Sequence, residues 1–373
     1  MKKHSIARLI LSLTLIALML FTFASCEMLD ELGNKISAAV DSLVSRDGSG
    51  KPATPSEGLE FTLCDDNQSY SVTGIGTCTD REILIPSEYS GLPVKSIGKE
   101  AFSWCYHLTG ITVPSSVTSI EDYAFYWCTG LTYASIPDSV VEIGAYSFYN
   151  CSSLEAVTVP NGVACIGEST FSYCSSLKSV AIPESVTSIG GGAFSGCSAL
   201  TQLSIPSAVT SIGGFAFSYC SNLRSINIPD NIKVIDSGMF AGCSSLADIV
   251  IPTGVTSIGD GAFSYCSALS EIAIPDSVTS IGNEAFAFCS GLLNITVPRG
   301  VTSIGDEAFY WCSKLSEITV ADSVTSIGRS VFYCCYSLTD IYYMGSAEEW
   351  AEIEIGKYNQ EIQDIGVRFG HAS

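Results

Sequence analysis

Sixteen cysteines are the residues of this 373-residue chain whose number first suggests chemistry. Thiolates bind zinc, attack substrates and form disulfides, so all three chemistries are candidates. Zinc sites use closely spaced cysteines together with histidines, but the chain has no Cys-x-x-Cys pair, and Cys334 and Cys335 are adjacent. The three histidines, His4, His107 and His371, lie far apart in the sequence. We therefore expect no metal site.

Eleven of the cysteines recur every 23 residues, from Cys105 to Cys335. A phenylalanine precedes each one by three residues and a leucine follows by three, so the cysteines fall in an apolar column. In such a column cysteine behaves as a small buried hydrophobic side chain, although stacked thiols are also close enough in principle to form disulfides. Cys165 lies off the column and is expected to be an exposed thiol.

Catalysis by a serine or cysteine nucleophile needs a histidine held beside it in a pocket. The array has no insertion between repeats that would build such a pocket around His107. Acidic residues are numerous, so a pair of carboxylates remains open as an alternative. We predict a protein that is not an enzyme and carries no cofactor.

The charge balance limits the class of partner. Seventeen Lys and Arg stand against 38 Asp and Glu, which gives a net charge of −21. Nucleic acids are bound through a basic surface, and this composition does not supply one. Direct binding to an anionic membrane surface is disfavoured for the same reason.

The repeat itself predicts the architecture. Leu-x-x-Ile-x-Ile/Val-Pro alternates as a short strand that ends at proline, and Val-Thr-Ser-Ile-Gly predicts a second extended piece. Ala-Phe-x-x-Cys-x-x-Leu places apolar residues three apart, as in one turn of 3₁₀- or α-helix. A fixed period of this length indicates a solenoid. We predict eleven 23-residue repeats over residues 97–343, with a parallel β-sheet on one side and short 3₁₀ or helical segments on the other.

This repeat, as in residues 274–296, resembles the BspA-type leucine-rich repeat of bacterial surface proteins. The resemblance covers about two thirds of the chain. Members of that family resemble adhesins, and the resemblance implies an exported or lipid-anchored protein at the cell surface. The implied partners are host proteins, extracellular-matrix proteins or other cells.

Residues 1–26 form a predicted secretory signal, because basic residues precede an apolar run that is too short to span a bilayer. Its end, Ala24-Ser25-Cys26, resembles a lipoprotein signal, which implies lipidation of Cys26 as the only membrane attachment. Cleavage near Ala24 that leaves Cys26 as a free thiol is the alternative. The Gly-, Ser- and Pro-rich end of residues 27–58 predicts a flexible tether.

Caps are expected at both ends of the array, since an open end would expose core side chains and unpaired backbone. Residues 59–96 predict a hairpin and a degenerate first repeat, and Cys64 and Cys78 flank that hairpin as a candidate disulfide. Residues 344–373 predict a capped helix containing Trp350 and Ile353, followed by a final strand.

Aromatic residues gather just before the column cysteines, and aromatics are common anchors of protein interfaces. The residue before an inward cysteine should point partly outward, but packing between repeats is the equal alternative. A second column turns acidic toward the C-terminus. The candidate partner-binding residues are Trp104, Tyr126, Trp127, Tyr173, Tyr219, Tyr265, Tyr310, Trp311, Asp248, Glu271 and Glu317. Sugars also stack on aromatic faces, so carbohydrate binding is the second hypothesis and a passive spacer the third.

The residue after the strand proline is acidic in every second repeat, which gives a 46-residue super-period. This set comprises Asp138, Glu184, Asp230, Asp276 and Asp322. Aspartate favours local hydrogen bonds in turns, which is the simpler explanation. A row of acids for a basic partner, or for loosely held Ca²⁺, is the alternative.

Overall fold

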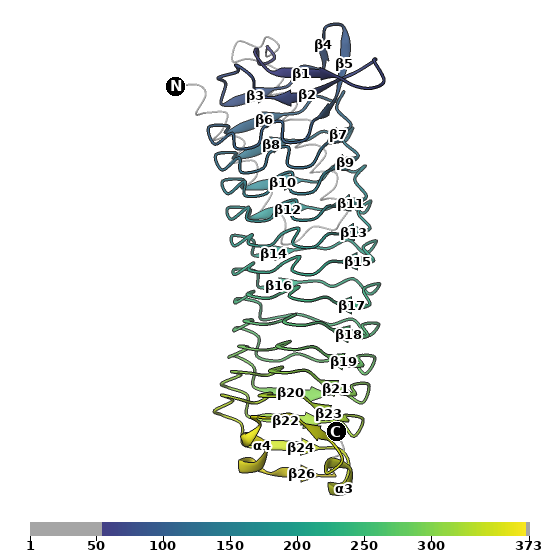
Figure 1. Cartoon of the computed structure of the whole chain (residues 1–373), viewed down its shortest axis with the longest axis vertical. Helices are drawn as coiled ribbons and strands as arrows, with labels where there is room; N and C mark the ends of the chain where they lie inside the picture. Colours follow the sequence, from purple (N-terminus) through teal and green to yellow (C-terminus); the bar gives the residue numbers. More distant parts are fainter. Residues whose placement is uncertain (1–53, 371–373) are drawn as a thin grey trace, which may run out of the picture.

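A computed structural model describes residues 54–370. The chain winds into one elongated parallel β-solenoid, with hairpins at its N-terminal end and two short helices at its C-terminal end (Figure 1). Equivalent residues of adjacent coils pair 23 positions apart, for example Ser257 with Ser280 and Ser280 with Ser303. The predicted fold class and period are confirmed. Within the described residues no helix is long and apolar enough to cross a membrane.

Two ladders of short strands run along the solenoid, where the sequence predicted one sheet. The first ladder is built by the Ile-x-Ile/Val phrase before the proline and contains β3 (Glu82–Leu84), β6 (Gly110–Thr112), β8 (Tyr133–Ser135), β10 (Ala156–Thr158), β12 (Ser179–Ala181), β14 (Gln202–Leu203), β16 (Ser225–Ile226), β20 (Asn294–Val297), β22 (Glu317–Val320), β24 (Asp340–Tyr343) and β26 (Val367–Phe369).

The second ladder is built by the Ser-Ile pair that precedes the repeat glycine. It contains β5 (Leu92–Ile97), β7 (Ser119–Ile120), β9 (Glu142–Ile143), β11 (Cys165–Ile166), β13 (Ser188–Ile189), β15 (Ser211–Ile212), β17 (Val234–Ile235), β18 (Ser257–Ile258), β19 (Ser280–Ile281), β21 (Ser303–Ile304), β23 (Ser326–Ile327) and β25 (Glu354–Ile355). Both ladders are interrupted, so the pairing forms several short sheets and not one continuous sheet.

The segment that carries Phe, Cys and Leu in each coil forms tight turns, so the expectation of 3₁₀ or helical segments is corrected. Cys105 donates its N–H three residues back to the carbonyl of Phe102 at 3.1 Å. Phe102 and Trp104 instead donate to Ala124 and Tyr126 of the next coil, at 2.8 and 2.7 Å. Alternate backbone donors therefore bond within the coil and between coils, which no helix does.

Two residues in each of these turns, four positions apart, have a positive φ, as Glu100 (61°) and Trp104 (64°) do. The left-handed conformation costs about 1–2 kcal/mol for a residue other than glycine. It recurs in all eleven repeats, including at Trp127, Tyr219 and Trp311. Stacking of each turn on its neighbours must therefore stabilise it, and the positive φ aims side chains such as Trp104, Tyr219 and Trp311 outward.

A continuous core fills the solenoid between the ladders and the turns. The eleven repeat phenylalanines, from Phe102 to Phe332, are fully buried. Their rings stack in one column with centroids 5.0 to 6.1 Å apart. Each ring thus packs against the same residue of both neighbouring coils, so no coil completes its own core.

The caps close both ends of this core. At the N-terminal end β1 (Glu60–Leu63) and β2 (Tyr70–Gly74) form an antiparallel hairpin, and β4 (Glu88–Tyr89) pairs with β5 in a second one. At the C-terminal end α3 (Ala347–Trp350) begins at a capping box of Ser346 and Glu349, and α4 (Gln360–Ile365) follows. The predicted final strand forms as β26 and pairs with β24.

Candidate interaction surface

The cysteine column is a ladder of buried thiols. Each thiol from Cys128 to Cys335 donates its S–H to the carbonyl of the phenylalanine 26 residues earlier, with Sγ to O distances of 3.0 to 3.3 Å. Desolvation by burial raises the pKa of Cys174, Cys220 and Cys289 to about 12. These thiols therefore stay protonated at neutral pH, and a protonated thiol is neither a nucleophile nor a metal ligand.

The other cysteines that the structure describes form no disulfide. Cys64 and Cys78 are free thiols, so the structure does not contain the candidate disulfide between them. Cys165 is exposed, as predicted. Cys26 and the predicted signal lie outside the described residues.

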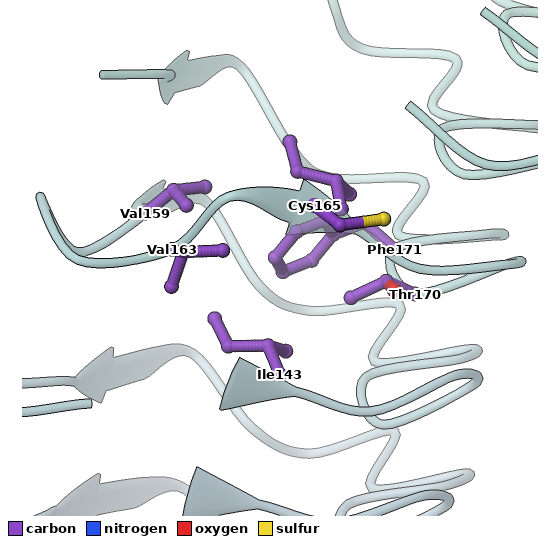
Figure 2. A pocket seen from close by; sticks show the side chains of 7 residues that line it. Ile143, Val159, Val163, Cys165, Thr170 and Phe171 are labelled. Carbon is purple, nitrogen blue, oxygen red and sulfur yellow. The ribbon is translucent and has the colours of Figure 1, made fainter. Parts of the chain in front are cut away.

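Residues 54–370 contain no group of three His, Cys, Asp or Glu side chains that could hold a metal ion. His107 is exposed on the surface of a coil. Figure 2 shows a gap beside β11, where Val159, Val163, Ile143 and Phe171 point toward one another. This gap leaves no room for a water molecule, so it is a packing defect of the core.

The aromatic residues before the column cysteines lie on the turn side; five of the seven are exposed, and Trp127 and Phe288 are partly buried. We call this row the aromatic stripe; it consists of Trp104, Trp127, Tyr173, Tyr219, Tyr265, Phe288 and Trp311. Trp104 is 48% exposed, Tyr219 61% and Trp311 40%. Both alternatives raised by the sequence hold at once, because the rings pack between coils and still present a face to solvent.

Near the N-terminal end the stripe forms an aromatic cluster. The rings of Trp104 and Trp127 stack with centroids 5.0 Å apart, and Tyr126 and Tyr106 meet Trp104 edge-on at 5.5 and 6.1 Å. Tyr126 also stacks on Tyr149 at 5.1 Å. This N-terminal aromatic cluster spans three adjacent coils.

A second cluster lies toward the C-terminal end. Tyr265 stacks on Phe288 at 4.3 Å, and Phe288 stacks on Trp311 at 6.0 Å. Tyr310 stacks on Tyr333, and Tyr336 meets Trp311 edge-on. We call this the C-terminal aromatic cluster.

Comparison with known proteins agrees with this geometry. The family described as BspA type Leucine rich repeat region matches in six copies, over residues 95–213, 170–292 and 256–358. The chain belongs to the BspA-type leucine-rich repeat family. No curated protein matches it.

Solved structures of bacterial leucine-rich repeat proteins are similar to this BspA-type chain. A leucine-rich repeat protein from Bacteroides ovatus is 27% identical, with a TM-score of 0.63 over 81% of this chain and 78% of that one. A leucine rich cell surface protein from Faecalibacterium prausnitzii is 31% identical, with a TM-score of 0.51 over 82% and 99%. The pneumococcal vaccine antigen PcpA, 17% identical with a TM-score of 0.53 over 85% and 97%, shares the fold alone.

Between its two clusters, the stripe of this BspA-type protein alternates tyrosine with glycine. A Cβ atom on Gly242 would lie 2.7 to 3.2 Å from three consecutive ring atoms of Tyr219, so the ring rests on the glycine by its face. Tyr173 covers Gly196 in the same way, at 2.8 to 3.3 Å. Glycine at these positions therefore makes room for the preceding tyrosine and adopts the left-handed conformation without strain.

Gly242→Ala is expected to destabilise the protein by more than the roughly 1–2 kcal/mol of a left-handed backbone, because the new methyl would also displace the Tyr219 ring. Urea unfolding measures the change. Gly91→Ala is the matched control, since Gly91 also has a positive φ but nothing within 4 Å of its Cβ position. Equal losses in the two variants would show that the ring contact contributes nothing.

The acidic candidates lie apart from the aromatic stripe. Glu317 is in β22 of the first ladder, and Asp248 forms a bridge with Ser225 in the same ladder. Glu271 occupies the equivalent position of the next coil, and all three carboxylates are exposed. The aromatics lie on the turns instead, so the fold places the two predicted sets on different strips of the surface.

Three of the five acids of the 46-residue super-period, Asp138, Glu184 and Asp322, contact a neighbouring coil. Asp138 accepts a hydrogen bond from the Asn161 backbone N–H at 3.1 Å, and Arg299 lies 3.8 Å from Asp322. These contacts join residues 23 positions apart in adjacent coils, so they are not the local turn hydrogen bonds that the sequence predicted.

The exposed aromatics that the sequence reasoning missed include Tyr106 (56% exposed), Tyr336 (74%) and Phe215 (54%). Phe215 occupies the first positive-φ position of its turn, with φ 58°. The sequence could have indicated Phe215, because it lies four residues before Tyr219 and so repeats the spacing of Tyr123 and Trp127.

Proposed function

We propose that this protein is a non-enzymatic binding protein of the cell surface, which engages host or extracellular-matrix proteins or other cells through its aromatic clusters. The observation that carries the proposal is the exposed aromatic stripe, since folding alone gives no reason to leave tryptophans half in solvent. Tryptophan and tyrosine are enriched among the residues that dominate protein interfaces. The Faecalibacterium relative, described as a cell surface protein, supports the location.

Substitution of stripe tryptophans is expected to weaken binding to a matrix protein. Trp104→Gly and Trp311→Gly suit the left-handed backbone at these positions, so folding is retained while the exposed ring is lost. Each is expected to lower affinity about 30-fold, the equivalent of ~2 kcal/mol for an interface anchor. Surface plasmon resonance against a panel of purified matrix proteins measures the effect.

Tyr358→Gly is the matched control, because Tyr358 is exposed and has a positive φ of 65° but lies in the C-terminal cap. In a second arm, Asp248, Glu271 and Glu317 are changed to their amides. If these acids steer the partner, the association rate and its salt dependence fall. Failure of the intact protein to bind any panel member or whole cells would overturn the proposal.

We further propose that a lipid on Cys26 is the only attachment to the membrane. Cys26→Ser is expected to move the protein from the membrane fraction to the soluble exported fraction, because a serine side chain offers no thiol for lipidation. Intact mass of the purified protein gives a second readout, with the lipid as added mass on an N-terminal cysteine. An unmodified N-terminus in the wild-type protein would contradict the anchor.

A further inference from the structure

The middle of the aromatic stripe differs chemically from the two clusters. Tyr173, Tyr219 and Tyr265 recur in every second coil, with Gly196 and Gly242 between them. Coils stacked at the spacing of β-strands place these rings about 10 Å apart. Tyr173 and Tyr219 each rest on a glycine by one face, and all three rings are 48 to 61% exposed. The row is therefore a series of spaced flat platforms that joins the two clusters, since Tyr173 meets Tyr149 edge-on at 5.5 Å and Tyr265 stacks on Phe288 at 4.3 Å.

The turn segments that carry these platforms contain no charged residue, although the protein has a net charge of −21. The five turn segments 169–177, 190–201, 213–223, 237–247 and 261–270 contain no Asp, Glu, Lys or Arg. A row of serines follows the cysteines beside the platforms. Ser198, Ser244 and Ser267 donate their hydroxyls to carbonyls of the preceding coils, which leaves their oxygens free to accept hydrogen bonds.

We propose that the row formed by Tyr173, Tyr219 and Tyr265 binds a neutral glycan chain that runs along the solenoid axis, with sugar rings stacked on the tyrosine faces. This site goes beyond the protein partner proposed above and does not need it. Regular ring-stacking platforms fit a polymer with regularly repeated rings, and nucleic acids and glycans are the two such classes.

Electrostatics and shape decide between the candidate ligands. Single-stranded nucleic acid stacks on aromatic platforms, but it also needs a basic groove for its phosphates. The net charge of −21 repels it, and repels anionic polysaccharides as well. The tyrosine row lies on an outward-facing surface and contains no tryptophan, the residue type that anchors the two clusters. A neutral polyhydroxylated chain needs neither basic groups nor a pocket.

The test is binding of the full exported protein to an array of neutral and anionic glycans, followed by calorimetry with the neutral oligosaccharide that binds best. Tyr219→Gly is expected to weaken that binding at least tenfold, which corresponds to about 1.4 kcal/mol. Glycine already occupies the equivalent positions 196 and 242, so this variant is expected to fold. Tyr219→Phe keeps the ring face and should bind nearly as well as wild type.

Tyr358→Gly makes the same chemical change at another exposed residue with positive φ and should leave glycan binding unchanged. The proposal would be overturned if the protein bound no neutral glycan or preferred anionic glycans. It would also be overturned if Tyr219→Gly bound the neutral oligosaccharide as tightly as the wild type. A matrix protein whose binding depends on Tyr219 but survives enzymatic deglycosylation would make this row a protein site instead. The Trp104 and Trp311 variants test the protein partner separately, so the two failures are distinguishable.

Discussion

Raising the pH from 8 to 10 is expected to destabilise this protein strongly, because its ladder thiols ionise only in the unfolded chain. Burial raises the pKa of Cys174, Cys220, Cys289 and Cys335 to about 12, and it raises the pKa of the other ladder thiols as well. In the unfolded chain each thiol has its ordinary pKa near 9.0. The protonated ladder therefore stabilises the fold fully below pH 9, and this stability is lost as the pH rises toward 12.

The size of the effect follows from the number of thiols. At pH 10 the ionisation of one unfolded thiol with a pKa near 9 lowers the free energy of unfolding by about 1.4 kcal/mol. The ladder thiols from Cys128 to Cys335 together lower it by roughly 14 kcal/mol, which is comparable with the whole stability of a typical domain. Urea unfolding under reducing conditions at pH 8, 9 and 10, followed by circular dichroism, measures the slope.

A variant with Cys197, Cys220 and Cys243 changed to alanine provides the control. This variant is less stable than the wild type at pH 8. Its free energy of unfolding should fall less steeply with pH, because about three fewer protons are released when it unfolds. Tyrosines titrate equally in both proteins, so the difference in slope belongs to the thiols. Identical slopes would contradict the proposed role of the ladder. Maleimide labelling of the native protein at pH 8 should modify exposed Cys165 and spare the ladder.

Removal of the C-terminal cap is expected to make the protein aggregate. The cap covers the last coil: the Trp350 ring packs edge-on against buried Tyr343 at 5.0 Å, and Ile353 and Ile362 are buried. Strands β25 and β26 also pair with the last strands of the two ladders. Truncation after Met344 exposes this apolar surface and an unpaired strand edge on each ladder, and such edges template association.

Size-exclusion chromatography with light scattering compares this truncation with a control that ends at Gly370. We expect a monomer for the control and large aggregates for the truncated chain. Asn359→Ala tests the cap without deleting it, since the Asn359 side chain accepts from the Val331 N–H and donates to the Gly328 carbonyl, both at 2.8 Å. Its expected loss is about 1–3 kcal/mol. A truncated chain that stays monomeric and melts like the control would contradict the capping role.

Sequence spacing predicted the inward columns well. Phe102 to Phe332 and Cys105 to Cys335 recur without a slip, and identical residues that meet in register can only stack. The spacing could not distinguish the turns from a helix, because 3₁₀-helices and the observed turns both make bonds three residues apart, such as Cys105 to Phe102. The bond that excludes a helix, from the Phe102 N–H to the Ala124 carbonyl, joins residues of different coils.

The repeat glycine was predicted from the sequence as the end of the second extended piece, but its physical reason is different. A Cβ on Gly282 would lie 2.6 Å from the backbone nitrogen of Asp260, and a Cβ on Gly305 2.5 Å from that of Asn283. Glycine is therefore required by the close approach of one coil to the next. Such a contact has no signature within a single repeat.

The sequence by itself determined the solenoid, its period and the residues of its core, because a strict repeat of 23 dictates which side chains stack in register. Only the tertiary structure decided the sign of φ before each cysteine, and hence that Trp104, Tyr219 and Trp311 face solvent. It also decided that Tyr219 rests on Gly242 and that the buried thiols donate to phenylalanine carbonyls. These features depend on contacts between coils. A single repeat would avoid the left-handed backbone conformation, but in the solenoid the neighbouring coils stabilise it.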